Sequence, residues 1–219
     1  MKRRVLQNSV RLRLLLGTVL LLGLSSAGCS KSPSEARASA ADACESLSAP
    51  ADVPAIVQVP AGNQLVHHFH AVGTQNYTCT ESPGMADAAS TYAWVFVAPE
   101  AALSNECGEL VGTHYAGPQG AATPRWQFTA DGSYVQGMKV QASPVTGSIP
   151  ELLLAATEAS AGTLANVTFV QRLAPDGGAA PDAAECSSAN VNELRKSNYT
   201  AEYYFYAGAP TPPPNGSGY

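Results

Sequence analysis

Short runs of β-branched and aromatic residues, interrupted by proline and glycine, recur along most of this chain. Several runs alternate apolar and polar side chains, which is the pattern of a strand with one buried face. Between two of them, the turn Ala130-Asp131-Gly132-Ser133 is typical of a hairpin. Strands without intervening helices predict an all-β fold, an antiparallel β-sandwich or barrel. We expect strands at 57–59, 64–72, 92–97, 126–129, 134–136, 167–173 and 199–206.

One segment of the chain predicts a helix instead. Ser148 and Glu151 have the spacing of a capping box, in which each side chain binds a backbone N–H at the start of a helix. Pro150 suits the first turn, where its missing N–H is not needed. The apolar run Leu152–Ala156 would form the body. We therefore expect one short helix at about 149–160, closing one end of the β structure.

The first 28 residues are typical of an export signal. Their basic residues precede the first acidic residue of the chain, Glu35. The apolar run Leu14–Leu24 that follows is shorter than the roughly 20 residues that span a bilayer. We expect residues 1–28 to be a signal peptide.

The end of this segment, Ala27-Gly28-Cys29, resembles a bacterial lipobox, whose cysteine becomes the first mature residue and carries lipid. Ser26 stands where that pattern has a leucine-like residue, so export without lipid is the alternative. Ser30, which is not aspartate, predicts sorting to the outer membrane. Residues 29–43 would be the lipidated cysteine and a flexible tether, because they lack large apolar side chains. Residues 44–206 would be the β-rich domain, and 207–219 a Pro/Gly-rich disordered tail.

The charge of the chain limits its partners. Twelve Lys and Arg side chains stand against 17 Asp and Glu, and removal of the five basic residues of the signal would leave seven against 17. A surface this acidic repels phosphate backbones and anionic head groups. We expect no nucleic-acid partner and membrane attachment through the lipid anchor only. An envelope glycan or protein is the partner class that remains.

Cysteine use agrees with export. Without Cys29 four cysteines remain, and an even number in an exported chain predicts two disulfides, with three possible pairings. Four free buried thiols are the alternative. The four residues are Cys44, Cys79, Cys107 and Cys186.

Few residues suggest chemistry. On a strand His68 and His70 point the same way, and with His114 they would form a three-histidine site for a divalent metal. The alternative is a solvated face of an edge strand. Motifs for nucleotide binding and zinc proteolysis, and a nucleophile elbow, do not occur in the sequence, so we expect no cofactor.

His114 also stands in a polar segment, Gly112–Pro118, where it could act as a general base. Asp131 or Ser133 of the hairpin turn would complete a triad-like group, as in a hydrolase or isomerase. The alternative is that His114 is hydrogen-bonded at a strand end and that Asp131 and Ser133 only shape the turn.

Several motifs occur in order between Pro60 and Tyr206: Gly73–Cys79, His114–Pro118, Asp131–Ser133, Ile149-Pro150 with Leu152–Leu154, Val170–Arg172 with Gly177-Gly178, Cys186, and Tyr199, Ala201, Tyr203 and Phe205 at alternate positions. Together they resemble the domain of unknown function 3455 family, exported proteins of bacteria and fungi for which no activity is established. Glu151 stands where the family often has tryptophan, and Gln119–Arg125 resembles an insertion. The resemblance implies a Cys79–Cys186 disulfide, which leaves Cys44–Cys107.

These observations predict an exported lipoprotein of the bacterial cell envelope, whose disulfide-stabilised β domain is a non-catalytic binding or structural module. A hydrolase or isomerase that uses His114, and a metal-binding protein, are the alternatives. The candidate polar site consists of His114, Tyr115, Asp131, Ser133, Arg172 and Tyr203.

Overall fold

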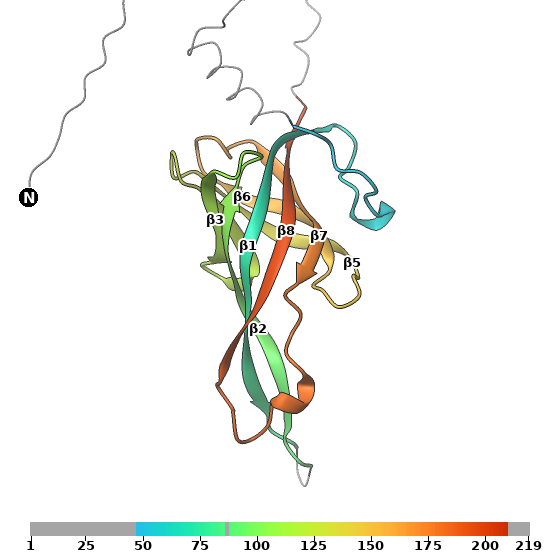
Figure 1. Cartoon of the computed structure of the whole chain (residues 1–219), viewed down its shortest axis with the longest axis vertical. Helices are drawn as coiled ribbons and strands as arrows, with labels where there is room; N and C mark the ends of the chain where they lie inside the picture. Colours follow the sequence, from blue (N-terminus) through green and yellow to red (C-terminus); the bar gives the residue numbers. More distant parts are fainter. Residues whose placement is uncertain (1–46, 86–87, 210–219) are drawn as a thin grey trace, which may run out of the picture.

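The structure, a computed structural model, describes residues 47–85 and 88–209. Their eight strands form a closed barrel, in which each strand pairs antiparallel with the next and β8 pairs with β1 (Figure 1). The prediction of an all-β fold is confirmed, in the form of a barrel. The strands are β1 (Asn63–Ser82), β2 (Thr91–Ser104), β3 (Leu110–Gly117), β4 (Gly120–Phe128), β5 (Tyr134–Ser143), β6 (Glu151–Ala159), β7 (Val167–Gly177) and β8 (Leu194–Gly208).

Helical structure among the described residues is limited to two short 3-10 turns, η1 (Ala55–Val57) and η2 (Ala183–Glu185). This part of the chain contains no helix with the length and hydropathy needed to cross a bilayer.

Alternation along β8 shows how the barrel is filled. Tyr199, Ala201, Tyr203 and Phe205 are almost completely buried, and the residues between them are partly exposed. The buried set belongs to the main core inside the barrel, together with aromatic and aliphatic residues of the other strands. Because strand side chains alternate between two faces, the apolar set of β8 faces the interior and the polar set faces outward.

The predicted helix at 149–160 is wrong, because this segment forms strand β6. Leu154 belongs to the core inside the barrel, whereas Leu153 belongs to a second apolar cluster with Val57 and Leu173. Both faces of β6 are therefore covered. A strand buried on both faces reads as a continuous apolar run, which its sequence alone does not distinguish from a buried helix.

The supposed capping residues bind β7 instead. The Ser148 hydroxyl accepts a hydrogen bond from the Gly177 N–H at 2.9 Å, and the Glu151 carboxylate accepts one from the Ala174 N–H at 3.2 Å. Side chains that would satisfy the free N–H groups of a helix start satisfy N–H groups of the neighbouring strand here.

The predicted strand at 57–59 is also wrong, since η1 ends at Val57 and the chain remains unpaired up to β1. This segment packs across the outside of the barrel, where Val57 covers Leu153 and Leu173. The amide of Gln171 donates a hydrogen bond to the Val57 carbonyl at 2.6 Å. The segment 57–59 cannot extend the sheet as a strand at this place, because β5, β6 and β7 are already paired on both sides.

Three strands continue beyond the barrel as a twisted ribbon (Figure 1). In this ribbon β1 still pairs with β2 and β8, but β2 has left β3 and β8 has left β7. We call residues 77–82, 91–98 and 194–197 the arm. The described chain enters and leaves at the opposite end of the barrel, where the Ala209 N–H donates to the Gly62 carbonyl.

The segment 178–192, which we call the strap, covers one face of the arm. The Cys79–Cys186 disulfide joins the two, which confirms the predicted pairing. The indole N–H of Trp94 donates to the Asp182 carbonyl at 3.1 Å. Cys107 is disulfide-bonded as well, and Cys44, predicted as its partner, lies outside the described residues.

Candidate functional site

The barrel interior contains a cavity of about 470 Å³. An eight-stranded barrel is just wide enough to be filled by side chains or to hold one small ligand, and this volume lies within the range of small-molecule sites. Its lining consists mainly of aromatic and aliphatic side chains. The polar and charged residues of the lining are Gln75, Tyr77, His114, Trp126, Lys139, Arg172 and Tyr203.

The cavity has a floor and a mouth. Phe69, Trp126 and Phe205 pack ring to ring and fill the barrel below it. The exposed lining residues Ala122 and Lys139 mark the mouth, beside the base of the arm. The segment that resembled an insertion, Gln119–Arg125, thus contributes the β3–β4 turn and part of this mouth.

His114 on β3 lies on the floor of the cavity. Its ring stacks on Trp126 with centroids 4.5 Å apart and lies 5.0 Å from Tyr203. Its Nδ1–H donates to the Arg125 carbonyl at 3.0 Å, because a carbonyl oxygen only accepts. Burial lowers the pKa of His114 to about 3, and the nearby charge of Arg172 acts in the same direction. The ring is therefore neutral at pH 7, a weak proton acceptor whose Nε2 has a free lone pair.

Arg172 on β7 brings a positive charge into the interior. It is 8% exposed, and its Nε and Nη2 donate to the Pro150 carbonyl at 3.1 and 2.9 Å. It forms no ion pair with a described carboxylate, and no Asp or Glu occurs in the cavity lining. A buried charge is normally paired. Arg172 is thus a buried cation that faces a cavity without a counter-ion from this part of the chain.

Two further donors in the lining lack partners. Among the described residues, the Nε2 of Gln75 and the indole Nε1 of Trp126 are buried without an acceptor at hydrogen-bond distance, although the Gln75 amide lies near enough to the Tyr199 hydroxyl to act on its pKa. The two residues are 3% and 1% exposed. An unsatisfied buried donor costs about 1–3 kcal/mol, so such groups are rare and call for an explanation.

The tyrosine hydroxyls around the cavity, in contrast, are engaged. The Tyr77 hydroxyl donates to the Gly178 carbonyl at 2.7 Å, and the hydroxyls of Tyr199 and Tyr203 lie 3.4 Å apart. Burial raises the pKa of Tyr199, which keeps its hydroxyl protonated. Gly178 has φ +75, and a Cβ there would lie 2.9–3.2 Å from Tyr199, Gln75 and Ile149, so only glycine fits this close approach.

Half of the predicted polar site is brought together, namely His114, Arg172 and Tyr203. The other half lies elsewhere. Tyr115 follows His114 on β3 and so points to the outside of the barrel, where its hydroxyl donates to the Gln127 side chain at 2.9 Å.

Asp131 and Ser133 fasten a turn. The Asp131 carboxylate accepts hydrogen bonds from the backbone N–H groups of Ser133 and Thr163. Its pKa is lowered by the Ser133 side chain first and then by these two N–H groups. The Ser133 hydroxyl accepts one from the Leu164 N–H at 3.3 Å. This turn follows the end of β4, whereas the cavity mouth lies at the start of β4. His114 therefore makes no triad with either residue.

The three predicted metal ligands are also separated. His68 and His70 lie on the outer face of β1, where both bind Glu202 and His68 also binds Glu106. His114 lies inside the barrel. In the described ranges no three His, Cys, Asp or Glu side chains are arranged to hold a metal ion.

Two residues of the cavity lining, Gln75 and Lys139, were not predicted from the sequence. A signal for Gln75 was present, because it alternates with Gly73 and Tyr77 inside a family-like motif and so shares their face. Nothing local marks Lys139, whose place at the mouth follows from the register of β5.

Comparison with known proteins agrees with this architecture. The model of the family described as protein of unknown function (DUF3455) matches residues 60–207, which include all eight strands up to the penultimate residue of β8. No curated protein and no solved structure matches the chain. Because the match covers well over half of the sequence, the chain belongs to the DUF3455 family.

Proposed function

We propose that this protein is an exported lipoprotein of the bacterial cell envelope that binds a small, largely apolar molecule inside its barrel. The observation that carries the proposal is the cavity, because the described residues place no acceptor at hydrogen-bond distance from two buried donors in its lining, Gln75 Nε2 and Trp126 Nε1. A bound molecule with an oxygen acceptor would satisfy them. Its body would cover the aromatic and aliphatic lining.

Three features favour binding over catalysis. His114 is a weak base, Asp131 and Ser133 lie at another turn, and the hydroxyls of Tyr77, Tyr199 and Tyr203 are engaged. None of these groups is set up as an activated nucleophile with its base. The lining would orient a bound molecule without presenting it with an activated nucleophile.

The ends of the described chain fit an anchored protein. The chain enters the barrel at the end opposite the arm (Figure 1), so a lipid on Cys29 and a tether would leave the cavity mouth and the arm directed away from the membrane. Cys29 lies outside the described residues.

Binding is tested with N-phenyl-1-naphthylamine, a neutral apolar probe that fluoresces when it leaves water. The polypeptide 30–219, exported behind a cleavable leader, keeps every described residue and needs no detergent. We expect one probe per chain. Ala121→Trp, which fills the mouth, should abolish binding, and the matched change Ala130→Trp in the β4–β5 turn should not. No binding, or equal binding by both variants, would contradict the proposal.

Lipidation is tested on the full chain by incorporation of an alkyne-labelled fatty acid in a bacterial host. Cys29→Ala should remove the label and Ser26→Ala should keep it. Label that persists in Cys29→Ala, or is absent from the wild-type chain, would argue against the anchor.

A further inference from the structure

We propose that the natural ligand of the cavity is a carboxylic acid with a flat apolar body, bound as its anion with the carboxylate at Arg172. This inference rests on the proposed binding function and specifies the chemical class of the ligand. It depends on which cations in the protein are paired, on which polar groups line the cavity, and on the shape of the floor.

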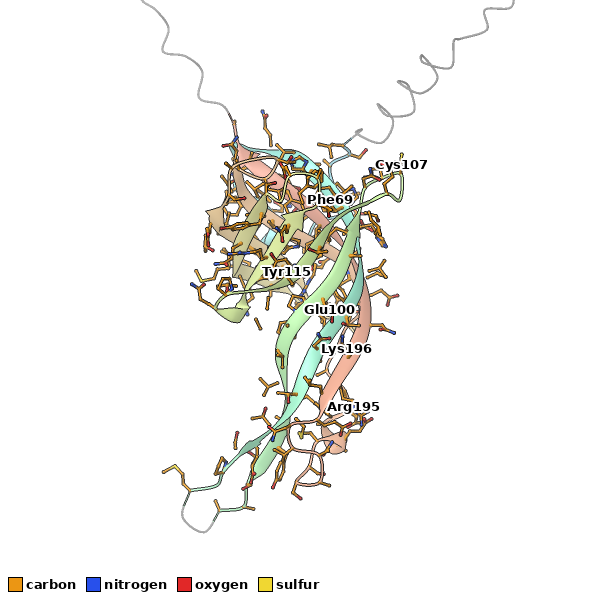
Figure 2. The ribbon with its side chains drawn as sticks, turned by 90° about the vertical axis from the view of Figure 1, so that its left-hand side faces the viewer. Phe69, Glu100, Cys107, Tyr115, Arg195 and Lys196 are labelled. Carbon is orange, nitrogen blue, oxygen red and sulfur yellow. A yellow bond between two sulfur atoms is a disulfide. The ribbon has the colours of Figure 1, made fainter. Side chains whose placement is uncertain are left out.

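The pattern of ion pairs singles out the cavity. The described residues include five Lys and Arg side chains, and three of them pair with carboxylates at the surface: Arg125 with Glu158, Arg195 with Glu185 and Glu193, and Lys196 with Glu100. Figure 2 shows Lys196 beside Glu100, and Arg195 farther along the arm. The two of these five described cations that form no ion pair, Lys139 and Arg172, both line the cavity.

The charge of the cavity is thus opposite to that of the chain, whose net charge is −5. In an acidic protein the field outside repels anions, so a positive interior without carboxylates is a specific feature of the site. Lys139 is exposed at the mouth and Arg172 is buried, which places a weaker attraction at the entrance and a stronger one within. Cationic ligands are disfavoured by both residues.

The free hydrogen-bonding groups near Arg172 complement a carboxylate. Within the described part of the chain, Gln75 Nε2 and Trp126 Nε1 have no acceptor at hydrogen-bond distance, and Arg172 uses Nε and Nη2 on the Pro150 carbonyl. An ionised carboxylate only accepts, and hydrogen bonds between ions are stronger than those between neutral groups. The neutral imidazole of His114 adds no competing charge.

The floor favours a flat body. His114 and Trp126 stack with an interplanar angle of 10°, and Tyr203 closes against both rings at 57° and 64°. Leu152, Leu154 and Ile149 add aliphatic surface to the wall. A planar apolar group lies well against such a surface, because aromatic rings gain from offset or edge contacts beyond the area they bury.

The test uses naphthalene-2-carboxylate and naphthalene-2-carboxamide, which have the same size and differ in charge. Calorimetric titration of the polypeptide 30–219 at pH 7.5 should show the carboxylate binding at least about tenfold more tightly. Arg172→Gln should remove this preference and Arg172→Lys should retain part of it. Lys196→Gln removes the same charge from a surface pair and should leave the preference unchanged.

The outcomes separate the two proposals. If N-phenyl-1-naphthylamine binds but the carboxylate has no advantage over the carboxamide in the wild-type protein, the carboxylate inference is wrong and the binding function stands. If none of the three compounds binds, both fail. A preference that persists in Arg172→Gln would overturn the role of Arg172. Should Arg172→Gln not fold, the wild-type comparison still decides the charge of the ligand, and Gln75→Leu, expected to weaken carboxylate binding severalfold, tests the donor set.

Discussion

The barrel and the arm share three strands, β1, β2 and β8, but the two regions are held together differently. In the barrel, closure turns one face of each strand inward, and Phe205 is 0% exposed. In the arm one face of the ribbon is covered only by the strap and the other lies near solvent, where Val95 of β2 is 46% exposed. A closed sheet creates its own core, whereas an open ribbon needs a covering segment, here the strap with its disulfide.

The two regions also differ in their strand edges. In the arm, Cys79 uses its backbone N–H and C=O on Glu193 and Asn192, on the β8 side. Its cross-strand partner Trp94 therefore turns its own backbone groups away from β1. No described strand pairs with β2 at that edge. The barrel, in contrast, has all its strand edges paired.

The largest effect is expected from a change in the barrel core. Phe205→Ala should lower the free energy of unfolding by about 3–5 kcal/mol, because it leaves a cavity between Phe69 and Trp126. Urea denaturation measures it. Val95→Ala in the arm should stay within about 0.5 kcal/mol. Comparable losses in the two variants would show that the arm carries as much of the stability as the barrel.

The next effect concerns the disulfide of the arm. Cys79→Ala with Cys186→Ala opens a loop of 107 residues and should cost about 2–4 kcal/mol. Hydrogen exchange should then accelerate for amides of the arm and the strap and remain slow for inward-facing positions of the barrel. Equal acceleration in both regions would mean that the disulfide supports the barrel directly and that the contrast between the two regions does not hold.

The same contrast explains what the sequence could predict. Strand β8 could be predicted because apolar and polar residues alternate along it, as expected for a strand with one buried and one solvated face. Strand β6 was not, because Leu153 lies under the segment around Val57 while Leu154 lies in the barrel. The segment around Val57 that covers Leu153 lies far from β6 in the sequence, so the residues near β6 do not indicate that its outer face is buried. The arm was predicted only in part, since 92–97 reads as a strand and nothing local shows where it leaves the barrel.

The candidate site was predictable to the extent that its residues lie in family-like motifs. His114, Arg172 and Tyr203 all turn inward on their strands and meet. Asp131 has the right chemistry but lies beyond the end of β4, at a distance that depends on how the barrel closes. Proximity across a barrel is set by strand register, which a single sequence does not reveal.

His114 in the interior and His68 on the outer wall should contribute to the stability of the fold with opposite pH dependence. For His114, burial lowers the pKa to about 3, while the unfolded chain takes up a proton near pH 6.5. Its contribution to stability is therefore lost as the pH falls below about 6.5, with a slope of about 1 kcal/mol per pH unit. In His114→Gln, urea denaturation between pH 4.5 and 6.5 should show a flatter decline than in the wild type. An unchanged slope would mean that the ring takes up a proton inside the barrel.

His68 on the outer wall should give the smallest effect, in the opposite direction. Burial by itself would lower its pKa, but hydrogen bonds and charge from Glu202 and Glu106 outweigh burial and raise it. The folded state then holds a proton more tightly than the unfolded state, so the stabilisation is fully present below about pH 6.5 and is lost as the pH rises through the folded pKa. In His68→Gln the loss of stability should be greatest near pH 6, below about 1 kcal/mol because the pair is partly solvated. Loss of the stack on Tyr204 adds an offset that does not vary with pH. A difference that grows with rising pH would contradict the assignment, because it would require His68 to be neutral between two carboxylates in the folded protein.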